Sequence, residues 1–189
     1  MPYPIPDPAT LAAQLSPPRP LPPVDCWNPP LLGDMDLRIA RNGVWHHEGI
    51  PLQRENLVRL FASILRQDDD GCYYLVTPVE KWRIQVDDAP FLAVRLDATG
   101  TGVNQRLTFT TSIGDIITAG TDHPLVVEYP VPGGEPCPYI HVRGRLCALL
   151  SRAVFVELVE WGEEQRVANE RIYGVWSQGQ FFNLGRLDE

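Results

Sequence analysis

Basic side chains at turns are the residues of this chain that are best suited to bind an anion. Arginine presents a planar fork of N–H donors, and lysine presents a compact cation. The turn Thr77–Lys81 follows a strand-like run and places Lys81, the one lysine of the chain, beside the Glu80 carboxylate. Because a turn after a strand displays side chains on a rigid base, this turn is the best site candidate. A surface ion pair between Glu80 and Lys81 is the alternative.

Two arginines, Arg54 and Arg143, each begin the pattern R-x-x-L-x-x-L. A strand-like run follows each pattern, at 72–76 and at 153–157. The two halves of the chain therefore look like an internal repeat, with both arginines at the start of a helix, where free backbone N–H groups and the dipole favour an anion. A ligand site at the junction of the two halves is then expected. The alternative is a chance similarity of two strand–helix–strand units, with both arginines in ordinary ion pairs.

We expect this site to bind a small anionic, nucleotide-like ligand through arginine forks. For His123, which precedes Pro124 at a turn, a structural hydrogen bond is the alternative use. The predicted binding residues are Arg54, Arg66, Thr77, Glu80, Lys81, Asp115, His123 and Arg143.

The sequence contains neither a metal-binding pattern nor a nucleophile motif. The run Asp68–Gly71 overlaps the calcium loop of an EF-hand, but Arg66 and Thr77 would stand where that loop needs carboxylates. A solvated turn with a left-handed glycine is expected there, or else carboxylates that orient Arg66. Adjacent His46 and His47 on a strand point to opposite faces, and the chain has no G-x-S-x-G and no phosphate-binding glycine loop. We therefore expect no metal and no cofactor, and we favour a ligand-binding or signalling module over a hydrolase or phosphotransfer enzyme.

Composition excludes several functions. The 189-residue chain is 44% hydrophobic and 21% charged, which is typical of a soluble globular protein. Its formal net charge of −8 argues against non-specific binding of nucleic acid. We find no signal-peptide pattern and no apolar run of the roughly 20 residues that span a bilayer. The four cysteines lack C-x-x-C spacing, so we expect free thiols and a cytoplasmic protein.

A helix with one apolar face is predicted before the candidate turn. Its apolar side chains recur at helical spacing, and we expect them to be buried. They are Leu57, Leu60, Phe61, Ile64 and Leu65.

The other elements are predicted from shorter patterns. Asn42-Gly43 between strand-like runs indicates a type I′ hairpin, and the run 146–150 predicts a short helix. The predicted strands are 37–40, 44–47, 72–77, 81–86, 91–98, 105–111, 115–119, 124–129, 139–142, 154–159, 171–176 and 180–184.

The predicted domains are a Pro-rich arm at 1–30, an N-terminal α+β domain at 31–88 and a C-terminal β-rich domain at 89–189. The predicted fold class is α+β, with two related domains that each contain a mainly antiparallel sheet and one helix. The arm contains P-x-x-P at Pro17–Pro20, so it either binds a protein partner or packs on its own domain. A pure interaction protein, which uses the arm or an open sheet edge, is the third functional interpretation.

An ordered series of motifs runs from Pro22 to Gly185. It includes WNPP at 27–30, GDMD at 33–36, DDDG at 68–71, YLVTPVEKW at 74–82, HVR at 141–143 and VWS at 175–177. On these motifs the chain resembles a bacterial family of domains of unknown function, number twelve-eighty-five. The resemblance implies a duplicated α+β core whose C-terminal half is superficially similar to pleckstrin-homology folds. It also implies a site for a nucleotide-like ligand at the domain interface and a signalling role, while no catalytic residues carry over.

Overall fold

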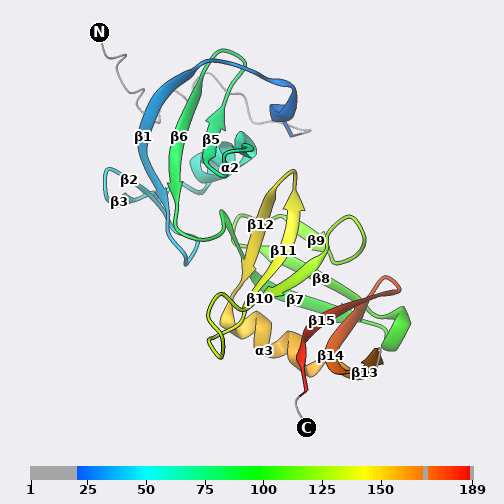
Figure 1. The fold of residues 1–189 in the computed structure, drawn as a ribbon. Coiled ribbons are helices and arrows are strands. Elements are labelled where there is room, and N and C mark those ends of the chain that lie inside the picture. The colour runs from blue at the N-terminus through cyan, green and yellow to red at the C-terminus, as the bar shows by residue number, and fades with distance from the viewer. Residues whose placement is uncertain (1–20, 168–169, 188–189) are drawn as a thin grey trace. The chain divides into compact units, whose positions relative to one another are not determined.

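The computed structural model describes residues 21–167 and 170–187, so most of the predicted Pro-rich arm lies outside the described residues. The chain divides into two compact units, Met1–Asp88 and Ala89–Glu189. Both are mostly sheet, as Figure 1 shows. In the described part of the chain, neither α-helix is long and apolar enough to cross a membrane.

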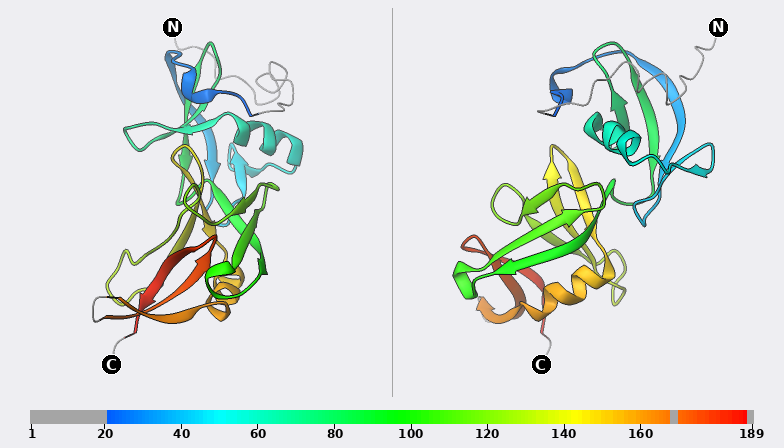
Figure 2. Two further views of the ribbon diagram at one scale, coloured as in Figure 1. Left: turned by 90° about the vertical axis from the view of Figure 1, so that its right-hand side faces the viewer. Right: turned by 180° about the vertical axis from the view of Figure 1, so that it is seen from behind.

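The first unit is a six-stranded sheet with a helix on one face (Figures 1 and 2). The strand order is β3-β2-β1-β6-β5-β4, and neighbours pair antiparallel except β1 and β6, which pair in parallel. Its elements are η1 (Val24–Cys26), β1 (Leu31–Ile39), β2 (Trp45–His47), β3 (Ile50–Pro51), α2 (Glu55–Ser63), β4 (Leu65–Gln67), β5 (Tyr73–Val76) and β6 (Lys81–Val86).

The core of the first unit lies between α2 and the apolar face of the sheet. Phe61 is fully buried, and its ring centre lies 6.3 Å from that of Trp45, with the two rings nearly parallel. The cross-strand neighbours Leu65, Leu75 and Trp82 continue this apolar face over three strands. Because side chains alternate along a strand, the intervening residues form a polar face on the other side.

Helix α2 ends earlier than predicted. Leu65 is buried as expected, but it belongs to strand β4, which pairs with β5. Leu57 and Leu60 are only half-buried, so the prediction that they are core residues is wrong. The Ser63 hydroxyl donates to the Leu60 carbonyl at 2.6 Å, a local bond of the kind that competes with helix continuation.

The β1–β2 hairpin forms as predicted, with Ile39 opposite Trp45, but its turn is not type I′. Gly43 has a φ of 79°, whereas Asn42 lacks the positive φ that a type I′ turn needs at both central positions. The Asn42 Oδ1 instead accepts a hydrogen bond from the Val44 N–H at 3.1 Å. The Asn-Gly pair therefore closes a longer loop.

The second unit contains a six-stranded sheet, a three-stranded sheet and one helix. The strand order of the large sheet is β10-β11-β12-β7-β8-β9, with β7 and β12 parallel, and the small sheet is the antiparallel order β13-β14-β15. The elements are β7 (Phe91–Thr99), η2 (Gly102–Asn104), β8 (Arg106–Thr111), β9 (Ile116–Thr118), β10 (Leu125–Glu128), β11 (Cys137–Arg143), β12 (Leu146–Leu150), α3 (Arg152–Glu160), β13 (Glu163–Val167), β14 (Glu170–Ser177) and β15 (Gln180–Arg186).

The two six-stranded sheets have the same strand order. In each, two three-stranded antiparallel meanders are joined by parallel pairing of the first strand with the last. Helix α2 connects the meanders of the first unit, whereas residues 119–124 connect those of the second. Two sheet-rich, mainly antiparallel halves are thus present as predicted, and similarity of the second half to pleckstrin-homology folds stays a prediction.

The predicted internal repeat aligned residues of the two units that have different secondary structure. Residues 146–150, predicted as a helix, form the buried strand β12, and residues 154–159, predicted as a strand, lie in α3. Strand β12 lies inside the sheet and its apolar run lacks the alternation that identifies a half-buried strand. Ser151 supplies the helix start signal, since its hydroxyl accepts from the Val154 N–H at 3.3 Å. The pattern therefore aligned a helix of the first unit with a strand of the second.

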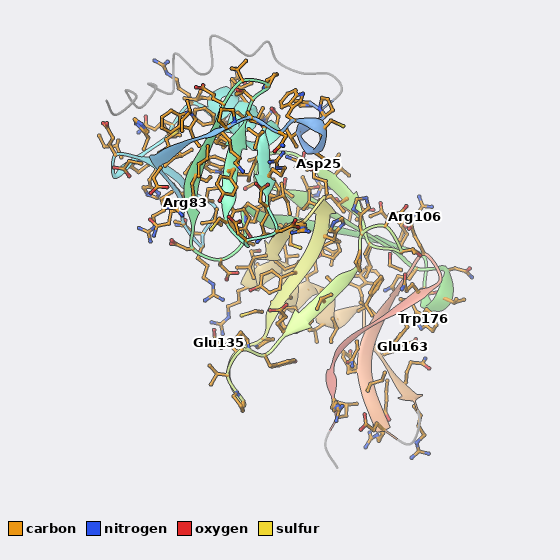
Figure 3. The ribbon with its side chains drawn as sticks, turned by 45° about the horizontal axis from the view of Figure 1, so that its top comes forward. Asp25, Arg83, Arg106, Glu135, Glu163 and Trp176 are labelled. Carbon is orange, nitrogen blue, oxygen red and sulfur yellow. The ribbon has the colours of Figure 1, made fainter. Side chains whose placement is uncertain are left out.

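A buried serine attaches the small sheet of the second unit to the large one. The Ser177 hydroxyl donates to the Ala119 carbonyl at 2.7 Å and accepts from the Leu107 N–H at 3.0 Å. The Gln105 amide donates to the carbonyl of Trp176, which Figure 3 labels, at 3.0 Å. These bonds satisfy backbone groups that would otherwise be buried without a partner.

The core of the first unit predicts a contrast between two neighbouring residues of α2. Phe61→Ala should lower the free energy of unfolding by about 3–5 kcal/mol, because it empties a fully buried position. Leu60→Ala, at a half-buried position, should cost less than about 2 kcal/mol. Urea denaturation measures both, and equal losses would contradict the packing described for α2.

The two hydrogen bonds of the buried Ser177 hydroxyl, which we call the Ser177 clamp, predict that removing this hydroxyl costs more stability than removing that of an exposed serine. Ser177→Ala should lower the free energy of unfolding by about 1–3 kcal/mol, because it leaves a buried N–H and a buried carbonyl unpaired. Ser112→Ala, at an exposed position of the same unit, should stay within about 0.5 kcal/mol of wild type. Indistinguishable thermal and urea midpoints for the two variants would rule out the clamp.

Candidate functional site

The polar face of the first sheet brings Arg66 and Lys81 together. Asp68 lies between them: its Oδ1 accepts from Arg66 Nε at 2.6 Å, and its Oδ2 accepts from Lys81 Nζ at 2.7 Å. The Lys81 ammonium also lies 4.3 Å from the centre of the Tyr74 ring, a cation–π distance. Arg66 Nη1 donates to the Val24 carbonyl at 2.7 Å and so holds η1 against β4. Both predicted cations are therefore bound by the chain itself.

The triple-aspartate segment combines the two alternatives that the sequence left open. Gly71 has a φ of 79°, and Asp70 accepts from the Cys72 N–H at 2.9 Å, as expected of a turn. Asp68 orients Arg66, and its side chain is 21% exposed. Burial by itself would raise the pKa of Asp68, but the hydrogen bonds from Arg66 and Lys81 outweigh burial and lower this pKa.

The remaining predicted residues of the first unit have different surroundings. Thr77 is buried, and its hydroxyl accepts from the Glu80 N–H at 3.1 Å, so these two residues shape the turn. The partner of Lys81 is Asp68, not Glu80. Arg54 is exposed directly before α2, and its carbonyl accepts from the Leu57 and Val58 N–H groups, whereas its side chain makes no hydrogen bond or ion pair with the residues that the structure describes.

In the second unit, Asp115, His123 and Arg143 gather at one end of the large sheet. We call this region the loop end: it comprises the turn 112–115, the connection 119–124 and the turn 143–145. Arg143 Nη1 lies 3.4 Å from Asp115 Oδ2. The pairing of β11 with β12 shifts register just before Arg143, a bulge of the kind that re-aims side chains beside sites.

The Arg143 guanidinium is partly removed from water. Its side chain is 24% exposed, and its central carbon lies 5.1 Å from the centre of the Phe91 ring. Burial lowers the pKa of Arg143, and the Asp115 carboxylate opposes that shift. The loop end therefore contains a cation that is incompletely solvated, in contrast to Arg54.

A second histidine, which the sequence did not place in the site, joins this group. The His123 Nδ1 lies 3.1 Å from the His141 carbonyl, and the two rings are 5.8 Å apart. The His141 Nδ1 lies 3.0 Å from the Asp122 carbonyl, and its Nε2 lies 2.8 Å from the Gly144 carbonyl. The signal that identifies His141 is the motif His-Val-Arg, in which it stands two positions before Arg143.

The cross-strand pair His141 and Cys147 does not have the features of a catalytic dyad. Burial raises the pKa of the Cys147 thiol, and the charge of Glu128 adds to that shift, so the reactive thiolate is disfavoured. Both ring nitrogens of His141 already face carbonyl oxygens. Within residues 21–167 and 170–187, no three His, Cys, Asp or Glu side chains are grouped to hold a metal ion.

The structure thus brings Arg66 and Lys81 together in one unit and Asp115 and Arg143 together in the other, while His123 contacts His141. A shared site with residues of both units stays a prediction.

Comparison with known proteins agrees with the motifs. Residues 22–89 match the family described as "Domain of unknown function (DUF1285), N-terminal domain", and residues 90–184 match its C-terminal domain. The chain belongs to the DUF1285 family. No curated protein matches it.

Two crystal structures of DUF1285 family proteins are similar to this chain. One, from Silicibacter pomeroyi, is 44% identical over 96% of each chain, with a TM-score of 0.87. The other, from Shewanella baltica, is 31% identical over 67% of this chain and 91% of its own, with a TM-score of 0.52. The predicted family is therefore confirmed, and its description assigns no activity to DUF1285 proteins.

The ion pairs of Asp68 with Arg66 and Lys81, which we call the Asp68 bridge, predict that the first unit loses stability in acid. Because the pKa of Asp68 is lower in the folded chain, its stabilisation is present above the unfolded value of about 3.9 and is lost as pH falls through the folded value. Between about pH 5 and about pH 3, wild type should therefore lose more stability than Asp68→Asn, which has no charge to neutralise. Asp36→Asn, at an exposed position, should keep the wild-type slope. Parallel urea-denaturation curves for all three proteins would contradict the bridge.

Proposed function

We propose that this protein is a ligand-binding module that binds a small anionic, nucleotide-like ligand at the loop end of its second unit. The observation that carries the proposal is Arg143, a half-buried guanidinium on a bulged strand end that contacts Asp115 and the Phe91 ring.

Burial makes Arg143 a stronger anion binder than a solvated arginine. Its charge is penalised by lost hydration, and an anion that replaces this hydration restores favourable contacts. The contact with Asp115, at 3.4 Å, is longer than the 2.7–2.9 Å or so of a strong charge-assisted bond. A phosphate would therefore compete well with this carboxylate for the guanidinium.

The histidines favour a nucleotide over a bare anion. The imidazole rings of His123 and His141 supply flat surfaces and polar edges within the same group of loops. Flat rings of this kind stack on nucleobases with little dependence on base identity. The ligand that fits this group has one phosphate and one planar ring.

Among the predicted cations of the first unit, Arg54 is the one that we propose contributes to binding of the same ligand. Arg66 and Lys81 are bound to Asp68, and removing either would leave that carboxylate with one cation in place of two. Arg54, by contrast, is exposed. A signalling role, a cytoplasmic location and a protein partner of the arm at 1–30 accompany this proposal as predictions, and no reaction is assigned.

Arg143→Ala should weaken anion binding by at least tenfold, because one charge-assisted hydrogen bond contributes about 1.5–3 kcal/mol. Calorimetric titration at low ionic strength with sulfate, pyrophosphate and ADP measures this, since salt screens such contacts. Arg106→Ala, at an exposed arginine of the same unit that Figure 3 labels, is the matched control and should bind as wild type does.

Arg54→Ala tests the contribution of the first unit in the same titration. A loss like that of Arg143→Ala supports a ligand that contacts both arginines, and wild-type affinity confines the ligand to the second unit. If none of the three anions binds wild type, or if Arg143→Ala binds them unchanged, the ligand-binding proposal is wrong.

A further inference from the structure

The Asp115 carboxylate has the same chemistry as the anion that the loop end is proposed to bind. It carries negative charge and accepts hydrogen bonds, and its Oδ2 lies 3.4 Å from Arg143 Nη1. A carboxylate donates no hydrogen bond to a phosphate, and its charge repels one. Asp115 is therefore unsuited to bind the ligand directly, although the sequence placed it among the predicted binding residues.

The turn that carries Asp115 is fixed by hydrogen bonds that do not involve Arg143. The Asp115 N–H donates to Thr111 Oγ1 at 3.0 Å, and the Asp115 carbonyl accepts from the Thr111 N–H at 2.9 Å. The Gly114 N–H donates to the Thr111 carbonyl at 2.9 Å. Because Thr111 is buried, the turn can keep its shape when the carboxylate loses its contact with Arg143.

The Arg143 guanidinium is held more firmly than the Asp115 carboxylate. Its central carbon lies 5.1 Å from the centre of the Phe91 ring, and Phe91 is fully buried. The Asp115 side chain is 33% exposed, so its carboxylate can turn toward water without a large loss of hydration. An anion from solution can therefore replace this carboxylate on Arg143 while the guanidinium stays on the ring.

We propose that Asp115 is a built-in competitor, which occupies Arg143 in the absence of ligand and which the anionic group of the ligand displaces. The inference rests on the proposed function, because it concerns the same guanidinium. A carboxylate attached to the chain is always present at high effective concentration, so it weakens the binding of every anion by a common factor. Monovalent anions, which bind one guanidinium weakly, are then excluded. A phosphate or pyrophosphate group has more charge and more acceptor oxygens, and is the class of group that still binds.

The test applies the calorimetric titrations with sulfate, pyrophosphate and ADP to Asp115→Asn, which keeps the size of the side chain and removes its charge. Each anion should bind about fivefold more tightly than to wild type, because a partly exposed ion pair no longer competes. Asp115→Ala, a second variant that retains the backbone bonds of the turn, should show at least this gain. Asp97→Asn is the matched control: it removes the carboxylate partner of Arg95, an arginine that is 69% exposed, and should bind as wild type does.

The class of ligand is tested on wild type. Acetate, a monovalent carboxylate, should bind at least about tenfold more weakly than pyrophosphate, because it brings less charge and fewer acceptor oxygens to the guanidinium. Equal affinities for acetate and pyrophosphate would show that the competitor does not select polyvalent anions.

A double-mutant cycle separates displacement at Arg143 from a general loss of negative charge. In Arg143→Ala, the further change Asp115→Asn should alter the residual binding by less than about twofold, since no guanidinium remains to compete for. A gain that persists without Arg143, an equal gain in Asp97→Asn, or no gain in Asp115→Asn would overturn the competitor and leave the ligand proposal standing. If wild type binds none of sulfate, pyrophosphate and ADP through Arg143, the ligand proposal is wrong, and the competitor with it.

Discussion

The parallel pairing of the first strand with the last is the constraint on which each unit of this protein depends. Every other strand contact in the two large sheets is antiparallel and is made within a meander of three consecutive strands. Without β1–β6 or β7–β12 pairing, each unit would be two small sheets, and three strands with one apolar face are close to the minimum for stability. Long-range closure of this type costs chain entropy, which the buried strands at the centre of each sheet must offset.

That pairing also explains why distant residues meet at the loop end. In the second unit the parallel pair places the starts of β7 and β12 at the same end of the sheet, with Phe91 opposite Ala148. The ends of β8 and β11 reach the same side because their neighbours run antiparallel to them. Arg143 therefore packs on Phe91 and contacts Asp115, although these residues are far apart in the sequence.

Sequence patterns predicted the strands in which apolar and polar residues alternate, and they missed elements that lack this alternation. The hairpins at 91–111 and 171–184 have the expected period of two, and the structure confirms them. Residues 146–150 are apolar throughout because β12 has covered neighbours on both sides, and such a run reads equally well as a helix. The opposite error occurred at 154–159, where β-branched residues in α3 favour a strand locally and tertiary packing of Val154 and Leu158 decides otherwise.

The residues of the candidate site, like the strands, were predictable from the sequence only in part. Arg143 was selected from the repeated pattern and His123 from a turn; the structure shows Arg143 in contact with Asp115, and His123 in contact with His141. The reason given for Arg143, a helix start, was incorrect, since it stands at the end of a strand. His141 was missed as a site residue because its importance depends on two carbonyl groups, and backbone geometry is not visible in a side-chain pattern. Arg66 and Lys81 were predicted in one candidate site, but a sequence pattern could not show that Asp68 already binds both cations.

The Ser177 clamp has a consequence for the order in which the chain matures on the ribosome. The first unit has all its strands once β6 is complete at Val86, and domains generally fold as units from the N-terminus during synthesis. The second unit must wait, since the backbone groups of Leu107 and Ala119 find their buried partner only when Ser177 has left the exit tunnel. Until then the nascent second unit exposes apolar surface that β14 and β15 later cover. A nascent chain halted before Ser177 would thus carry a finished first unit and an unfinished second one, the form in which chaperones would meet it.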